Sequence, residues 1–308
     1  MPASTWRKKT DIYAILMRRI MYSRITFLLL FISAPYLGAA QSPKRFHLPK
    51  DLIEVSGLFY AGKDSLWWHN DSGRSPTLFL TDGRGKLLTK RDLYPLTNRD
   101  WEDITSDPSG NIYIGDFGNN ANNRKDLKVY ILSPDKRIDS LLFQYPDQKR
   151  FPPPAQAANF DMEAFFWYAD SLHLFSKNKL VKGNYFTKHY RLPARPGTYT
   201  ADLQDSLYLK KRVITGAAVS PDGRRVALVA YNFKRFLGFI PTSAASVLWF
   251  DDFSGTKFLQ GTMHKVNLAC LLATQYESID FEDNDRVIVA SERTVIIPQK
   301  ARRIRLKR

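Results

Sequence analysis

The sequence predicts an all-β propeller with five four-stranded antiparallel blades, closed by a strand from the N-terminal part of the fold. Three observations support this prediction: a short strand pattern that occurs five times, a second strand at a nearly constant distance after each copy, and hairpin turn signals such as DPSGN and SPDGR. Four strands per repeat of about 40–60 residues are typical of a propeller blade. No stretch has the sustained 3.6-residue period of a helix, which argues against alternating strands and helices.

Each copy of the first strand has a polar second position and a small or acidic third position. The copies are VSGLFY at 55–60, WEDITS at 101–106, MEAFFW at 162–167, ITGAAV at 214–219 and YESIDF at 276–281. The polar second positions, at spacings of 46, 61, 52 and 62 residues, are Ser56, Glu102, Glu163, Thr215 and Glu277. Six blades is the alternative, if one of the two longer repeats contains an irregular blade.

The other strands follow each copy in order. The second strands place Asn70, Asp116, Ser176, Ala230 and Ser291 at one equivalent position, 13–15 residues after the polar residue. Third strands are expected in TLFLTD, LKVYIL, KHYRLP, SVLWFD and TVIIPQ, and fourth strands in KLLTKRDL, SLLFQYP, SLYLKKRV and TKFLQGT. Residues 41–55 contain KRFHLP, which we expect to complete the last blade, because ring closure removes exposed sheet edges.

The N-terminal segment has the form of a secretory signal peptide. From Met21, a short basic segment is followed by an apolar stretch and by small residues at Gly38 and Ala40, which predicts cleavage before Gln41. Translation starts at Met1 or Met21. We therefore expect residues 1–40 to be an upstream extension and signal peptide, and residues 41–308 to be a single propeller domain with a basic C-terminal tail. The mature protein is expected to be extracytoplasmic, either periplasmic or secreted.

The net charge of +16 is concentrated at the two ends of the chain. The first 40 residues carry +5, and residues 300–308 add six positive charges without an acid. No nucleic-acid motif accompanies these charges, so we expect no nucleic-acid partner. The basic C-terminal tail either forms part of a sheet or contacts an anionic surface. The single cysteine, Cys270, excludes an intramolecular disulfide and a cysteine-based zinc site.

The repeated acidic positions predict a metal site, since equivalent positions of the blades converge at the mouth of the central channel. Several carboxylates in a small space need a cation, a base or raised pKa values. Calcium takes six to eight oxygen ligands, whereas five histidines without a pair at ligand spacing do not favour zinc or copper. The predicted calcium ligands are Glu54, Asp100, Glu102, Asp161, Glu163 and Glu277. Alternatively, these acids pair with Arg and Lys or cap turns.

Two loop motifs and two later residues predict a ligand site beside the metal. HNDSG at 69–73 and GDFGNN at 115–120 follow the second strands of the first two blades, and Lys177 and Tyr231 follow the same strand later. A Lys and a Tyr among carboxylates suit an anionic or hydroxylated ligand. The predicted ligand-binding residues are Asn70, Asp71, Asp116, Asn119, Asn120, Arg124, Lys177 and Tyr231. Alternatively, the Asn and Asp residues only form turns, and Lys177 only neutralises the acids.

These motifs also carry a resemblance to a known family. The run EVSGL, HNDSG, DWEDI and GDFGNN, followed by Arg124, resembles a family of secreted bacterial propellers. The later segments DMEA, ITGA, YESI and ASER are similar to the SdiA-regulated propellers and, more distantly, to phytase- or esterase-like propellers. The resemblance covers nearly all of 41–308 and implies an extracytoplasmic propeller with a calcium site. It implies no particular reaction, because one fold hosts many functions.

Three functions are compatible with these observations. We favour a module that binds a small molecule, a glycan or a protein at the channel mouth. A calcium-dependent hydrolase of a phosphate ester or a lactone is the second, with Glu102 and Glu163 as its candidate catalytic bases. The third is a structural envelope protein. The sequence has no G-x-S-x-G, H-E-x-x-H or Walker motif, which excludes the enzyme classes that depend on them.

Overall fold

The computed structural model describes residues 43–177, 185–210, 212–236, 240–269, 274–294 and 297–307, with only the backbone for 233–236, 240–243 and 269. The expected signal peptide and Cys270 lie outside the described residues. Nearly all regular structure is strand, with two short 3-10 helices, η1 (Ala155–Ala157) and η2 (Phe258–Gln260). Within the described part of the chain, no helix is long and apolar enough to cross a membrane.

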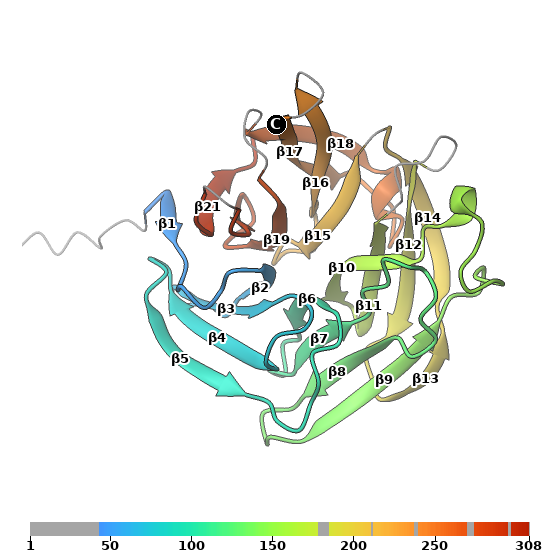
Figure 1. Ribbon diagram of the computed structural model, residues 1–308, viewed down its shortest axis with the longest axis horizontal. Helices are drawn as coiled ribbons and strands as arrows, with labels where there is room; N and C mark the ends of the chain where they lie inside the picture. Colours follow the sequence, from blue (N-terminus) through green and yellow to red (C-terminus); the bar gives the residue numbers. More distant parts are fainter. Residues whose placement is uncertain are drawn as a thin grey trace, which may run out of the picture. The chain divides into compact units, whose positions relative to one another are not determined.

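The described strands form five sheets that stand as blades around a ring (Figure 1). The first blade contains β2 (Val55–Tyr60), β3 (Ser65–Asn70), β4 (Thr77–Asp82) and β5 (Leu87–Asp92). The second contains β6 (Trp101–Ser106), β7 (Ile112–Asp116), β8 (Lys128–Leu132) and β9 (Ile138–Gln144). The third contains β10 (Asp161–Tyr168), β11 (Ser171–Lys177), β12 (Phe186–Pro193) and β14 (Asp202–Tyr208).

The last two blades complete the ring. The fourth contains β15 (Val213–Val219), β16 (Val226–Phe236), β17 (Ile240–Asp251) and β18 (Thr262–Ala269). The fifth contains β19 (Tyr276–Phe281), β20 (Arg286–Ser291), β21 (Lys300–Arg305) and β1 (Arg45–His47). The innermost strands β2, β6, β10, β15 and β19 contact one another in a closed cycle. The prediction of five antiparallel four-stranded blades is therefore confirmed, and the six-bladed alternative is wrong.

Ring closure uses the N-terminal strand, as predicted. Strand β1 pairs antiparallel with β21, with Phe46 opposite Ala301. The basic tail is therefore an internal strand through Arg305, flanked by β1 and β20. Its Arg303 is buried and forms ion pairs with Glu282 at 2.7 Å and with Asp64 of the first blade at 3.1 Å.

Three strands differ from the sequence prediction. The fourth strand of the fourth blade is β18, not TKFLQGT at 256–262, because Phe258 and Leu259 lie in η2 and are buried there. The third strand of the fifth blade is β21, not TVIIPQ at 294–299, of which 295 and 296 lie outside the described residues. An unpredicted strand, β13 (Gly197–Thr200), leaves the third blade and pairs parallel with β9 of the second.

The core consists of layers between neighbouring blades. Among the described residues, the buried apolar side chains fall into five clusters, and each cluster joins two adjacent blades. Trp68, for example, packs between the fifth and first blades, and Trp101 packs between the first and second. Each blade is buried on both faces and is therefore held rigidly. The strand ends that carry the polar loops are thus fixed in position around the channel.

Candidate functional site

Every innermost strand has a β-bulge at the polar second position of the repeat. The register shifts between Val55 and Gly57 in β2, and at the equivalent point in the other four innermost strands. The residues that the register omits are Ser56, Glu102, Glu163, Thr215 and Glu277. A bulged residue is left out of the ladder, and bulges re-aim side chains beside functional sites. The polar second position of the repeat is therefore the bulged residue of each innermost strand.

The two hydroxyl residues among these five connect neighbouring blades. Ser56 Oγ donates a hydrogen bond to the carbonyl oxygen of Glu102 at 2.5 Å. Thr215 Oγ1 donates to the carbonyl oxygen of Tyr276 at 2.8 Å. Both hydroxyls thus link neighbouring blades by hydrogen bonds. The carboxylates of the three glutamates are the remaining candidate functional groups at this level of the channel.

Five carboxylates from three blades meet near the bulges. Ligand oxygens of Asp71, Asp100 and Glu102 lie within 4.8 Å of one another, and so do those of Asp71, Glu277 and Glu292. Asp71 belongs to both groups and joins them. We call these five residues the acidic cluster. It draws Asp71 from the first blade, Asp100 and Glu102 from the second, and the other two from the fifth.

Burial first, and then repulsion between carboxylates, raises the pKa values of Asp71, Glu102 and Glu292. Burial, followed by the charge of Glu277, raises the pKa of Asp71 to about 7. Burial and Glu163 raise the pKa of Glu102 well above its usual range, and burial and Glu277 raise that of Glu292 to about 10. Among the described side chains, no Lys or Arg forms a salt bridge with any of the five. The cluster must therefore hold protons or bind a cation.

Lys177 provides a positive charge at the border of the acidic cluster. Its Nζ lies 2.8 Å from Glu163 Oε1. Burial alone would lower the pKa of Lys177, but the negative charges around it, Glu163 first, raise it well above its usual value. Asp161, two residues before Glu163, accepts a hydrogen bond from the Asn119 amide at 2.7 Å. The third blade thus contributes an ion pair, whereas the first, second and fifth contribute unpaired acids.

Gly118 leaves open the space beside two of the carboxylates. A Cβ atom at this position would lie 2.0 Å from Glu102 Oε1 and 2.4 Å from Asp100 Cγ. The amide of Gly118 also donates to the carbonyl oxygen of Asp100 at 3.2 Å. The glycine in the GDFGNN motif therefore permits the close approach of this loop to the acidic cluster.

Several predicted site residues build the surrounding loops instead. Asp116 and Arg124 form a buried ion pair of 2.9 Å, and Arg124 also donates to the carbonyl oxygen of Gly118. Asn119 Oδ1 accepts hydrogen bonds from the backbone amides of residues 123 and 124, whereas Asn120 is exposed. The Asp116–Arg124 ion pair and Asn119 together fix the loop that carries Gly118.

Two predicted residues of the first blade also have structural partners. Asn70 accepts the amide of Glu54 and donates to the carbonyl oxygen of Asp51. The Glu54 carboxylate pairs with Arg74 at 2.6 Å, and both side chains are 43% exposed. Tyr231 is buried, and burial, partly opposed by the Lys177 ammonium, raises its pKa above the ordinary value.

Glu292 is the residue that sequence analysis left out of the predicted site. It follows Ser291 directly, as Asp71 follows Asn70 and Lys177 follows Ser176, so its repeat position was a usable signal. Asp71, predicted as a ligand-binding residue, occupies the centre of the carboxylates. Glu54, Asp161 and Glu163 lie outside the two carboxylate groups, whereas Asp100, Glu102 and Glu277 lie within them.

The acidic cluster suits a hard cation in its donor atoms and spacing. Calcium–oxygen distances of about 2.3–2.6 Å place two ligands on opposite sides of the ion about 5 Å apart. The ligand oxygens of each group lie within 4.8 Å of one another, so each group can reach a single ion of this kind. All five donors are carboxylates. The histidine of the HNDSG motif, His69, forms a hydrogen bond through its Nδ1 with the carbonyl oxygen of Asn70. The residues therefore fit calcium better than zinc.

No family model and no curated protein matches this sequence. Solved structures do match its fold. A mannose phosphorylase from Leishmania mexicana in complex with phosphate is 12% identical, over 91% of this chain and 93% of that chain, with a TM-score of 0.50. An α-L-arabinofuranosidase from Fusarium graminearum with an iminosugar inhibitor is 10% identical, over 86% and 98%, with a TM-score of 0.50. A gluconolactonase from Xanthomonas campestris is 13% identical, over 84% and 88%, with a TM-score of 0.45. These likenesses concern the fold alone.

Proposed function

We propose that this protein is an exported propeller that binds a divalent cation, calcium in preference to magnesium, at its acidic cluster. The observation that carries the proposal is the position of Asp71, which joins two groups of carboxylates that lack described salt-bridge partners. The ion would be held by Asp71, Asp100, Glu102, Glu277 and Glu292. Export is proposed from the signal-peptide pattern before Gln41.

The same cluster would bind a ligand with negative or hydroxyl groups. Lys177 and Tyr231 lie at its border, and both can donate hydrogen bonds. Because calcium takes six to eight oxygen ligands, an ion held by these carboxylates would also accept oxygen atoms of a ligand. The ligand therefore belongs to the anionic or polyhydroxylated small molecules or glycans.

A thermal unfolding experiment tests cation binding. Calcium that binds only the folded protein stabilises it by RT ln(1 + [Ca]/Kd), about 2.7 kcal/mol at a hundredfold excess over Kd. Chelator should lower the Tm, and calcium should restore it more effectively than magnesium, which prefers fewer protein ligands. Glu102→Gln should abolish this response and raise the Tm in chelator, because it removes a repelling carboxylate.

Glu54→Gln is the matched control for Glu102→Gln. It makes the same charge change on an exposed residue that is paired with Arg74, so the calcium response should persist. A Tm that is insensitive to both chelator and calcium would falsify the metal proposal. A Glu102→Gln protein that loses stability equally with and without calcium would instead assign this carboxylate a structural partner.

Hydrolysis of a phosphate ester or lactone is the second candidate function. A bound calcium ion would polarise the oxygen of a carbonyl or phosphoryl group. Glu102, as a ligand of that ion, would be anionic and would act as a candidate base that orients a water molecule beside it. Burial raises the pKa of Glu163 well above its usual value, and the Lys177 ammonium opposes this rise. Glu163 would therefore be the candidate base that takes a proton from water. Proteins named as sugar-active enzymes share this fold, so the fold is compatible with such chemistry.

A substrate panel separates the two candidates. Hydrolysis of phosphate esters or lactones should require calcium and fall in both Glu102→Gln and Glu163→Gln if the protein is a hydrolase. Saturable calcium-dependent binding of these compounds without turnover would establish the binding module and reject the hydrolase.

A further inference from the structure

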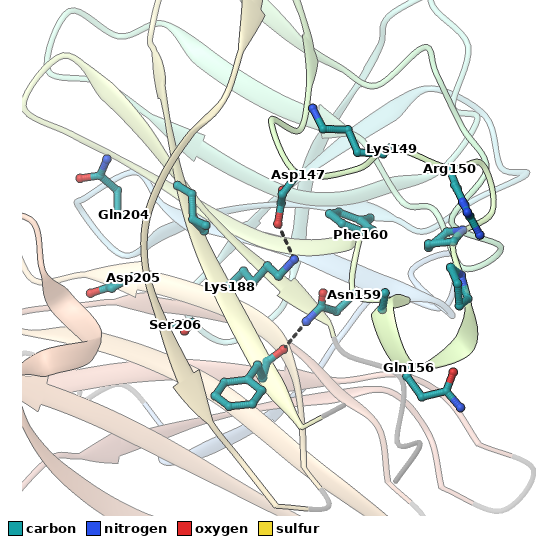
Figure 2. A pocket seen from close by; sticks show the side chains of 15 residues that line it. Asp147, Lys149, Arg150, Gln156, Asn159, Phe160, Lys188, Gln204, Asp205 and Ser206 are labelled. Carbon is teal, nitrogen blue, oxygen red and sulfur yellow. Dashed lines mark hydrogen bonds and ion pairs between the residues drawn. The ribbon is translucent and has the colours of Figure 1, made fainter. Parts of the chain in front are cut away.

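A pocket lies on the outer strands of the third blade, separate from the acidic cluster. It has a volume of about 580 Å³, is open to solvent, and is lined by residues of the loop 147–160 and of strands β12 and β14 (Figure 2). It shares no residue with the acidic cluster. This volume lies in the range of pockets that hold small molecules, which is roughly 300–1,000 Å³.

One wall of the pocket is fixed by a network of side chains. The Lys188 ammonium pairs with the Asp147 carboxylate, as Figure 2 shows, and lies 4.3 Å from the centre of the Phe160 ring. Asp147 also accepts a hydrogen bond from the Tyr190 hydroxyl at 2.9 Å. Because Tyr190 and Phe160 are buried, the wall is held in place before any ligand enters.

The remaining charge of the pocket is positive. Lys149 and Arg150 line it and are exposed, and within the described chain neither forms a salt bridge or a side-chain hydrogen bond. Of the two acids, Asp147 forms an ion pair with Lys188, and Asp205 forms a hydrogen bond with His189, whose pKa is lowered by burial. Three basic residues against two acids leave the lining with a net positive charge. The two unpaired cations therefore favour a ligand that carries an anionic group.

The other surfaces suit a sugar ring. Phe186 and Leu203 are 42% and 43% exposed and line the pocket, so apolar area is available for the face of a ring. Asn159 is 5% exposed and donates to the carbonyl oxygen of Phe186, while its Oδ1 has no partner among the described residues. An unsatisfied buried acceptor is costly. Because Asn159 lines the pocket, a rotation of its amide would bring this oxygen to a ligand hydroxyl.

We propose that this pocket binds a sugar that carries an anionic group, a carboxylate or a phosphate. Lys149 and Arg150 would bind the anionic group, Phe186 and Leu203 the apolar face of the ring, and Asn159 a hydroxyl. The proposal does not depend on calcium, because the pocket and the acidic cluster are separate.

Calorimetric titration of the full protein in chelator tests the proposal. The probes are a galacturonic acid trisaccharide, mannose 6-phosphate, and the neutral sugars galactotriose and mannose. At least one anionic probe should bind about tenfold more tightly than its neutral counterpart. The double variant Lys149→Gln/Arg150→Gln should weaken it about tenfold or more, as expected for the loss of charge-assisted hydrogen bonds. Phe186→Ala should weaken the anionic and neutral probes alike.

The matched control is Arg84→Gln/Lys86→Gln, which removes two exposed charges from the β4–β5 turn of the first blade and should leave binding unchanged. Equal losses in both double variants would show a non-specific charge effect and overturn the proposal. It would also be overturned if neutral sugars bound as tightly as anionic ones, if inorganic phosphate bound as tightly as mannose 6-phosphate, or if no probe bound at millimolar concentration.

Discussion

The ammonium nitrogen of Lys177 lies 2.8 Å from Glu163 Oε1, beside carboxylates that have no such partner among the described residues. Lys177 is therefore a partly buried cation next to the proposed calcium site, and it lies nearest to Glu163. Like charges repel across a low-dielectric site, so Lys177 must weaken the binding of any divalent ion nearby. It also stabilises the protein when no ion is bound, because it compensates part of the negative charge.

Lys177→Gln should therefore tighten calcium binding while it destabilises the calcium-free protein. From the Coulomb interaction at an effective dielectric constant near 20, we expect the Kd for calcium to fall roughly tenfold or more. The Tm in chelator should fall, because Glu163 loses its partner. Calcium titration and thermal unfolding measure the two effects. Lys90→Gln, which removes an exposed lysine paired with Asp51, should change neither, and weaker calcium binding in Lys177→Gln would contradict the prediction.

Gly118→Ala should disrupt calcium binding without unfolding the protein. Its Cβ would lie 2.0 Å from Glu102 Oε1, which forces this carboxylate or the loop to move. We expect the calcium-induced rise in Tm to be largely lost, while the circular dichroism spectrum remains that of the wild type. Asn120→Ala, in an exposed position of the same loop, is the control. An unchanged calcium response in Gly118→Ala would show that Glu102 is not a ligand.

The blades could be predicted from the sequence because each one repeats the same physical requirements. Each needs apolar residues for the layers between blades, a turn between its first two strands, and a polar residue at the bulge. The offset of 13–15 residues between Glu102 and Asp116, and between their equivalents, is the length of one hairpin with its bulge. Closure by residues 45–47 could be predicted because the fifth repeat lacked one strand.

The strands that escaped prediction lack such a signature. Phe258 and Leu259 look like part of a strand, but they lie in η2, and Phe258 packs against Phe166 and His173. Strand β21 contains four basic residues, and it is accommodated in a sheet because Arg303 finds Glu282 and Asp64. These acidic partners are distant from Arg303 in the sequence, so no local sequence pattern predicts the two ion pairs.

The candidate site could be predicted as a set of repeat positions, but not as a set of contacts. The sequence shows that Asp71, Lys177 and Glu292 follow the same strand in different blades. It does not show that Asp116 is bound by Arg124 within its own loop, or that Arg74 reaches Glu54. Whether an acid is available to a ligand depends on such pairs, which only the folded chain defines.

A buried histidine pair in the third blade should make stability depend on pH. His173 Nδ1 lies 2.9 Å from His189 Nε2, and His189 Nδ1 lies 2.8 Å from Asp205 Oδ1. Burial, followed by the neighbouring His189, lowers the pKa of His173 to about 3 from an ordinary 6.5. Between these two values the unfolded chain binds a proton that the folded protein does not, so His173 destabilises the fold as the pH falls from about 6.5.

His173→Gln, which keeps an N–H donor for His189, should remove this part of the pH dependence. Between pH 7 and pH 5 the wild type should lose about 1–2 kcal/mol of unfolding free energy more than the variant does. Urea unfolding at a series of pH values measures the difference. Parallel stability curves for the two proteins would show that His173 does not titrate differently in the folded and unfolded states.

Arg303 and Arg305 lie in the same basic strand, β21, one nearly buried and the other exposed. Replacing each in turn tests whether this strand stabilises the ring. The Arg303 side chain is 6% exposed and pairs with Glu282, which is 9% exposed, and with Asp64. Arg303→Gln leaves the nearly buried Glu282 carboxylate with Arg286 at 3.5 Å as its remaining cation. Removal of one partner from a buried pair typically costs about 3–5 kcal/mol, and we expect a loss near the lower end of this range. Arg305 is 64% exposed and lies 3.8 Å from Asp285, so Arg305→Gln should cost less than about 0.5 kcal/mol.

Urea unfolding of the two variants distinguishes a strand of the ring from a surface tail. Because Arg303 contacts Glu282 and the first blade, its loss should weaken the closure of the ring and lower the stability of the whole domain in one cooperative transition. If the two substitutions instead had equal and small effects on stability, and equal effects on binding to anionic vesicles, the C-terminal segment would act as a surface-binding tail. A large loss confined to Arg303→Gln would establish β21 as the strand that, together with β1, closes the propeller.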